Sequence, residues 1–232
     1  MTSLRKTCHS LRNFIDDTLP DPSILSITII VEPEIISLDL NFSKSDLPLG
    51  IVYHKKEFGV LVEKVMQFEE DTVSPQTLKF LEILEFMDSF FIDFEVFLRF
   101  LKSQKSEIQH FEFTLCGVDG SEFSSRIQKI LQKNQVLKSS NLTLKIHRAS
   151  EVMSFLPYFS AGILKKIEIS NSKRTDFDLN LEQVSELEQW KKAKILIVNF
   201  FTVRGPRKFL DSEKSVANFM TITVDDARML IE

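Results

Sequence analysis

The sequence has little cysteine and no long apolar run. Cys8 and Cys116 are its 2 cysteines among 232 residues; their separation argues against a disulfide framework and favours a reducing compartment. No stretch approaches the about 18 apolar residues that a membrane-spanning helix requires, and residues 1–10 hold no apolar core of a signal peptide. We therefore expect an intracellular protein, cytoplasmic or nuclear, with no membrane partner.

The chain also lacks a strong charge of either sign. Its net charge of -4 includes no broad basic excess that would bind a phosphate backbone, so we expect no nucleic-acid partner. Its aromatic residues are 21 Phe against 2 Tyr and 1 Trp. This balance is typical of core packing rather than of a binding surface that needs polar aromatic tips.

Motifs for catalysis, cofactors and metals are missing as well. The sequence contains no Gly-rich nucleophile elbow and no nucleophile placed beside an oriented base. Residues Gly117–Ser121 lack the Lys and the Gly spacing of a phosphate-binding loop and indicate an ordinary capped turn. Cys8 with His9, and Cys116 with His110, are too few and too far apart for a zinc site. We expect no enzymatic activity, no cofactor and no metal, although a deep pocket with convergent polar groups would revive the enzyme hypothesis.

The second half of the chain contains a loose alternation of short strands and amphipathic segments. Within the strands apolar and polar residues alternate with a period of two, and Ser121, Ser150 and Asn180 are candidate caps of the helices between them. The repeat of roughly 20–35 residues falls in the range of solenoid proteins. The strands are expected at Gln109–Leu115, Leu142–His147, Ile163–Ile169, Lys194–Phe201 and Phe219–Val224.

This pattern predicts the fold class. We expect an α/β protein with a leucine-rich-repeat-like β/α solenoid, in which the strands follow one another in a mostly parallel sheet with helices on one side. A short helix and an antiparallel β segment are expected to precede it. The free face of such a sheet and its edge loops offer a surface to another protein.

The first part of the chain divides into a helix and an extended region. Residues 1–18 carry Leu4, Cys8, Leu11 and Ile15 at helical spacing, and the helix is expected to pack on the strands that follow through Leu11 and Ile15. Residues 19–70 are expected to form the antiparallel segment. Its three extended runs are Leu25–Val31, Ile35–Phe42 and Gly50–His54.

Residues 71–232 are assigned to the β/α repeat domain. We expect this domain to open with two helices, at Gln76–Met87 and at Phe94–Ser103, with Asp93 as the cap of the second.

Four segments resemble a known nematode family. Leu4–Asp16 is similar to the last helix of an F-box. Phe155–Tyr158, Leu164–Ile169 and Leu187–Lys194 resemble the most distinctive segments of the FTH domain, also called domain of unknown function 38. The order and spacing of these segments agree over nearly the whole chain with a family that joins the two modules.

The resemblance implies a substrate receptor of an SCF-type ubiquitin ligase. In that role the F-box docks on the Skp adaptor and so joins the cullin, while the FTH domain holds a protein client. The family's F-box has several helices, and this sequence begins inside the last of them, so Leu4 and Leu11 are the expected adaptor contacts. The alternative is a free-standing interaction scaffold, or a competitor that binds the client without recruiting the ligase.

The strand pattern predicts residues that would contact the client. Trp190 has two interpretations, a client anchor or a residue that packs a helix on the sheet. The candidate contacts comprise polar residues expected to face out from neighbouring strands and two arginines of a basic loop around Gly205. Ordinary solvated side chains are the alternative interpretation. The candidates are His110, Glu112, Lys145, His147, Lys166, Glu168, Arg204 and Arg207.

Overall fold

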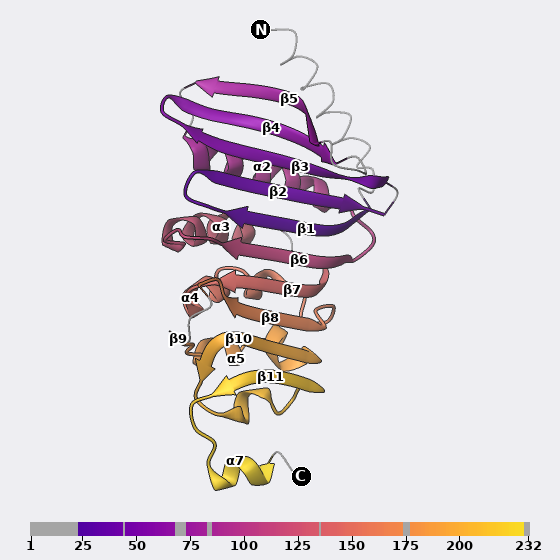
Figure 1. Cartoon of the computed structure of the whole chain (residues 1–232). Coiled ribbons are helices and arrows are strands. Elements are labelled where there is room, and N and C mark those ends of the chain that lie inside the picture. The colour runs from indigo at the N-terminus through magenta and orange to yellow at the C-terminus, as the bar shows by residue number, and fades with distance from the viewer. Residues whose placement is uncertain are drawn as a thin grey trace.

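The protein is built around a single large sheet with helices on one side (Figure 1). This computed structural model describes residues 23–43, 45–67, 73–82, 85–134, 136–173 and 177–229. Within them eleven strands pair in the order β11-β10-β8-β7-β6-β1-β2-β3-β4-β5, and β9 pairs with β10 beside this path. In Figure 1 the helices α2 to α5 lie behind the sheet, so the viewer faces its open side.

The N-terminal half of the sheet is an antiparallel meander. Each strand pairs with the next along the chain, as short connections require. The predicted antiparallel pairing of the first three extended runs is confirmed. The strands are β1 (Ile24–Val31), β2 (Ile35–Phe42), β3 (Ser45–Lys56), β4 (Gly59–Gln67) and β5 (Val73–Glu82).

The two helices predicted after residue 71 are wrong in number and place. Most of the first falls on β5, which pairs with β4 from Val73 to Glu82. A single helix, α2 (Phe86–Leu101), follows and contains Asp93 in its middle rather than at its cap. The pattern of a short segment does not by itself distinguish a strand from a helix, and here pairing with β4 makes β5 a strand.

The C-terminal half confirms the predicted sequential parallel sheet. β6 (Ile108–Leu115), β7 (Ser139–Ile146), β8 (Lys166–Asn171), β10 (Ile195–Val203) and β11 (Lys214–Phe219) pair in parallel in chain order. The two-residue strand β9 (Phe177–Asp178) also pairs in parallel with β10. Leucine-rich-repeat-like solenoid character stays a prediction, which strand order alone does not establish.

Only the first crossover of this half contains a long helix among the described residues. The longest is α3 (Ser121–Lys133), and the later crossovers contain only one or two turns of helix. These are α4 (Ala149–Met153), η1 (Leu156–Tyr158), α5 (Glu182–Ser185), α6 (Glu188–Lys192) and η2 (Pro206–Phe209).

The last predicted strand is displaced. β11 ends at Phe219, and the helix α7 (Val224–Met229) begins where the strand was expected to finish. Thr223 and Asp226 explain the difference: the Asp226 amide donates to Thr223 Oγ1 at 3.1 Å, and the Thr223 amide donates to Asp226 Oδ2 at 3.0 Å. This reciprocal cap starts a helix and stops the extended chain.

A cluster of phenylalanines joins the helices to the sheet. Phe113 of β6 lies with its ring centroid 4.2 Å from that of Phe155 and 5.4 Å from that of Phe123 in α3. Phe123 in turn lies 5.5 Å from Phe90 of α2, which contacts Tyr53 of β3 at 5.7 Å. One continuous aromatic core therefore spans the antiparallel and parallel halves.

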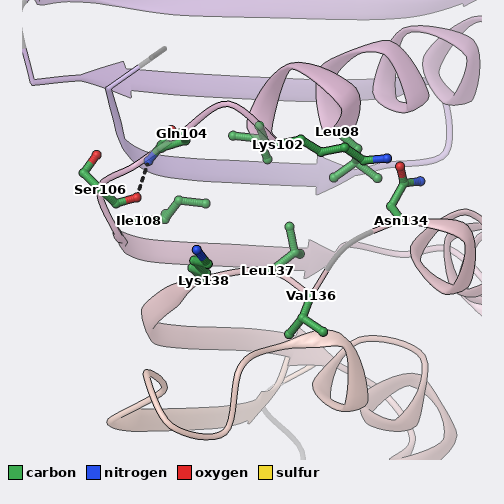
Figure 2. Close-up of a pocket in the computed structure, with 10 residues that line it drawn as sticks. Leu98, Lys102, Gln104, Ser106, Ile108, Asn134, Val136, Leu137 and Lys138 are labelled. Carbon is green, nitrogen blue, oxygen red and sulfur yellow. Dashed lines mark hydrogen bonds between the residues drawn. The ribbon is translucent and has the colours of Figure 1, made fainter. Parts of the chain in front are cut away.

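The two halves meet where β1 pairs in parallel with β6. Gln104, which is buried between α2 and β6, accepts from the Ile24 amide at 3.1 Å and donates to the Ile24 carbonyl at 2.8 Å. It also donates to the Ser106 carbonyl at 3.2 Å (Figure 2). The cavity beside it measures about 50 Å³, well below the size of a ligand pocket.

The assignment of faces predicts unequal effects of substitution. Phe113 and Leu144 are fully buried, whereas Lys145 is 45% exposed. We expect Phe113→Ala and Leu144→Ala to lower the free energy of unfolding by about 2–5 kcal/mol each. Lys145→Ala is expected to lower it by less than about 1 kcal/mol. Urea denaturation of the three variants checks this, and equal midpoints would contradict the assignment.

Candidate protein-interaction surface

The open face of the sheet carries polar side chains in registered rows. One row runs across five neighbouring strands and alternates carboxylates with threonines. Its members are Asp39, Thr28, Glu112, Thr143 and Glu168. The row exists because parallel and antiparallel partners place residues of equal register side by side on one face.

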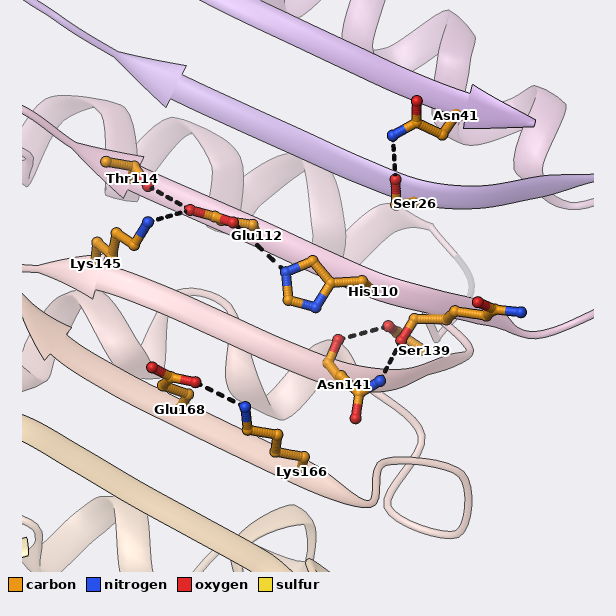
Figure 3. A network of polar contacts seen from close by, with 11 residues as sticks. Ser26, Asn41, His110, Glu112, Thr114, Ser139, Asn141, Lys145, Lys166 and Glu168 are labelled. Carbon is orange, nitrogen blue, oxygen red and sulfur yellow. Dashed lines mark hydrogen bonds and ion pairs between the residues drawn. The ribbon is translucent and has the colours of Figure 1, made fainter. Parts of the chain in front are cut away.

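Basic side chains flank this row on both sides. Lys145 Nζ lies 2.6 Å from Glu112 Oε1, and His110 Nε2 lies 3.5 Å from Glu112 Oε2 (Figure 3). One strand further, Lys166 Nζ lies 2.8 Å from Glu168 Oε2. Figure 3 shows two separate groups on this face, one around Glu112 that joins β6 to β7 and one within β8 that pairs Lys166 with Glu168.

Five of the predicted candidates are therefore brought together on one face: His110, Glu112, Lys145, Lys166 and Glu168. Glu112 also accepts from Thr114 Oγ1 at 3.3 Å, and Glu168 accepts from Asn199 Nδ2 at 3.4 Å. Mutual hydrogen bonds limit the rotamers of these side chains before any partner arrives.

The other three candidates lie at the carboxyl edge of the strands. His147 follows the last residue of β7, and its Nδ1 lies 2.8 Å from Ser172 Oγ. Arg207 Nε lies 3.0 Å from Asp226 Oδ1, whereas Arg204 is exposed. Hydrogen bonds from Thr223, and then Arg207, hold the pKa of Asp226 below its ordinary value. The eight predicted residues thus occupy two regions rather than one.

Trp190 anchors the loop that carries the two arginines. Its side chain is 3% exposed, and Nε1 donates to the Lys208 carbonyl at 2.7 Å. Its ring centroid lies 5.5 Å from that of Phe209, so Trp190 packs the helix on its surroundings and is not a surface anchor. A depression of about 400 Å³ lies beside this loop. Its lining includes Arg204 and Arg207 of the loop together with Thr223 and Leu181.

Asp39 belongs to the open face but was missed by the sequence analysis. Burial raises the pKa of its carboxyl group, and within the part of the chain that the structure describes it has no hydrogen-bond or ion-pair partner. A Cβ on Gly50 would lie 2.9 Å from Asp39 Oδ1, so the neighbouring strand leaves room for this carboxylate with a glycine. Asp39 alternates with apolar neighbours in β2, but its cross-strand position follows only from the register.

Phe200 is the second residue that the sequence analysis missed. Its φ of 58° is unusual for a bulky side chain, and it is 44% exposed. The register between β10 and β11 shifts between Val198 and Thr202, so Phe200 lies in a bulge. The signal in the sequence is a spacing of three, instead of two, between the buried residues Val198 and Phe201.

Leu4 and Leu11, the predicted adaptor contacts, lie outside the described residues. Across the described ranges, no three or more His, Cys, Asp or Glu side chains are grouped so that they could hold a metal ion. None of the helices in these ranges has the length and apolar character needed to cross a membrane.

The two carboxylates of the open face predict opposite pH effects. Burial acts to raise the pKa of Glu112, but hydrogen bonds and charges from Lys145 and His110 outweigh it and hold the pKa below its ordinary value. Glu112 therefore stabilises the fold above its unfolded pKa, and this contribution is lost as the pH falls through the folded pKa. Asp39 has the opposite effect on stability. Because burial raises the pKa of its carboxyl group, its negative charge opposes folding at neutral pH.

We expect Glu112→Gln to lower the denaturation midpoint at pH 7, by an amount that shrinks as the pH falls through the lowered pKa of Glu112. Asp39→Asn is the matched control and is expected to raise the midpoint at pH 7. Denaturant titrations at pH 7 and at a series of acid pH values measure both. A Glu112→Gln effect that is independent of pH, or a destabilising Asp39→Asn, would contradict the electrostatic assignment.

Comparison with known proteins identifies a domain in the C-terminal part. Residues 121–231 match the family model of the FTH domain, a match that begins at α3 and includes β7, β8, β9, β10, β11 and α7. No curated protein and no solved structure matches the chain. The FTH family indicates protein partners and a protein-interaction role associated with F-box proteins. The domain boundary at residue 71 stays a prediction. The chain carries a domain of the FTH family in residues 121–231.

Proposed function

We propose that this chain is a substrate receptor of an SCF-type ubiquitin ligase and holds its protein client on the open face of the sheet. The observation that carries the proposal is the registered row of carboxylates and threonines from Asp39 to Glu168, on a face that no described helix covers. The FTH match supports a protein partner. The proposal contains no catalytic step and no cofactor.

The chemistry of the face favours recognition of a specific partner. The paired charges, Glu112 with Lys145 and Glu168 with Lys166, are partly exposed, and such groups contribute more to specificity and association rate than to affinity. Asp39 adds a carboxylate that lacks a cation among the described residues, which a basic group of the client would neutralise. Phe200, in the bulge of β10 and outside this row, is an exposed aromatic side chain of a residue type suited to an anchor at an interface.

A free-standing scaffold, or a competitor for the same client, is the second candidate. The family match favours it because it covers the FTH domain and no F-box. The two candidates share the client-binding face and differ in whether the chain recruits the Skp adaptor and the cullin.

Adaptor binding distinguishes the two candidates. If the chain is a receptor, we expect it to bind the Skp adaptor with a submicromolar dissociation constant. If it is a scaffold or competitor, we expect binding at least a hundredfold weaker, a difference of about 2.7 kcal/mol. Calorimetry with purified proteins measures it. Binding at least a hundredfold weaker than submicromolar would contradict the receptor and favour the scaffold.

Charge reversal on the open face tests client binding. We expect Glu112→Lys combined with Glu168→Lys to reduce capture of the client at least about tenfold, because like charges then meet Lys145 and Lys166. The matched control is Glu122→Lys combined with Glu186→Lys, which reverses two exposed acids on the helix side. Quantitative mass spectrometry of proteins captured from cells, scored for client, adaptor and cullin, compares them.

Equal capture by the wild type and the open-face variant would reject this face as the client site. Equal losses in the control variant would show a general effect of charge.

A further inference from the structure

The strand β11 lies at one end of the sheet and has β10 as its neighbour on one side only, among the strands that the structure describes. At its two ends, the Lys214 amide donates to the Lys194 carbonyl at 3.0 Å and the Met220 amide donates to the Val203 carbonyl at 2.9 Å. Backbone groups alternate in direction along a strand. The even-numbered residues of β11 therefore direct their backbone groups toward β10, and the odd-numbered residues direct theirs away from it.

The outward-facing backbone groups of β11 belong to Ser215, Ala217 and Phe219. The part of the chain that the structure describes supplies no hydrogen-bond partner for their amides and carbonyls. Each of these residues offers one donor and one acceptor, at the spacing that another strand matches. The outer edge of β11 is therefore a template for one more strand.

The opposite edge of the sheet is protected against such pairing. β5 contains Pro75, which has no amide hydrogen to donate, and its pairing with β4 omits Gln76, so β5 contains a bulge. Prolines and bulges are common devices that keep an edge strand from pairing with another chain. β11 contains no proline, and all its residues take part in the pairing in unbroken order. The two edges differ, and β11 is the one open to pairing.

Exposed apolar side chains accompany this edge. Val216 is 46% exposed, and Met220, which follows the strand, is 51% exposed. On the other face of β11, Ala217 and Phe219 pack on the core, and the ring centroid of Phe219 lies 5.6 Å from that of Phe209. Val216 therefore faces the open side of the sheet, where a strand laid along β11 would remove its apolar surface from water.

We propose that β11 binds an extended peptide segment of another protein as an additional strand of the sheet. The segment carries apolar residues at every second position, which contact Val216 across the new strand pair. In this mode of binding, backbone hydrogen bonds supply affinity and alternate side chains supply specificity. The inference concerns the edge of the sheet and does not depend on the proposed function, which uses the open face.

The position of α7 favours a peptide over a second copy of the chain. In Figure 1 this helix lies beyond β11, in the direction in which the sheet would continue. Arg207 Nε lies 3.0 Å from Asp226 Oδ1, an ion pair that joins η2 to α7. One added strand widens a sheet by about 5 Å. A second copy would bring its further strands and helices to the place where α7 lies.

Peptide selection against the full chain tests the proposal. The probe is a phage-displayed library of random peptides of about ten residues, a length that can pair with all of β11. We expect the selected peptides to share apolar residues at alternate positions. Hydrogen exchange of the full chain with a synthetic selected peptide is expected to slow at the amides of Ser215, Ala217 and Phe219.

Substitution of Ser215, whose side chain is exposed, separates backbone pairing from side-chain contact. Ser215→Pro removes an outward donor, and we expect it to weaken binding of the selected peptide at least about tenfold. Ser215→Val is the matched control, because it retains the amide, and is expected to change binding by less than about twofold. Circular dichroism confirms that both variants fold.

Peptides with N-methylated backbones make the same test on the wild-type chain if Ser215→Pro does not fold. Methylation at one set of alternate residues blocks the amides that face β11 and is expected to abolish binding, whereas methylation at the other set leaves it. The chain with Glu112→Lys and Glu168→Lys is expected to bind the peptides as the wild type does. Failure of the proposed function would therefore leave this result unchanged.

Several outcomes would overturn the proposal. One is a selection that yields no peptide with the alternating pattern. Others are equal binding to the Ser215→Pro and Ser215→Val chains, or equal effects of the two sets of methylated residues. A dimer of the wild-type chain in analytical ultracentrifugation that Ser215→Pro dissociates would assign the edge to a second copy instead.

Discussion

The parallel pairing of β1 with β6 is the constraint on which the rest of the structure depends. It joins an antiparallel meander to a parallel β/α array and makes one sheet of both. Gln104 satisfies the backbone of Ile24 at the start of this seam, and the phenylalanine cluster covers it on the helix side. Without the seam, each half would expose the backbone edge of a strand that is now central.

The seam also creates the interaction surface. The row from Asp39 to Glu168 crosses from the antiparallel half into the parallel half, so neither half carries it alone. The match to the FTH domain begins at residue 121, after Glu112 and Asp39 in the chain. A client on this face would therefore contact side chains from outside the matched residues as well as from within them.

The sequence allowed prediction of the elements that depend on local pattern. Alternation in β6, β7 and β8 identified their buried residues, such as Phe111, Leu144 and Ile167, and helical crossovers between strands implied the parallel order. The five candidates on the open face follow from the same alternation.

Features that depend on pairing between distant strands could not be predicted from the sequence. The sequence of β5 mixes polar and apolar residues without a clear period, so it was predicted as a helix, and only its pairing with β4 identifies it as a strand. Asp39 joins the open row because β2 pairs it with Thr28 of β1, which in turn pairs with Glu112 of β6. Gly50 of β3 leaves room for its carboxylate. The side chain of Phe200 is set by a bulge, which depends on neighbouring strands more than on its own residue type.

The central position of β1 also bears on how the chain folds during synthesis. β1 pairs with β2 as soon as both have been made, but its other edge pairs with β6, which ends at Leu115. Some eighty residues of chain therefore have to emerge between the first strand and its second partner, and pairings of such separation form slowly. During that interval the open edge of β1 is a template for wrong strands, so the nascent meander is the stage at which this protein is most exposed to misassembly.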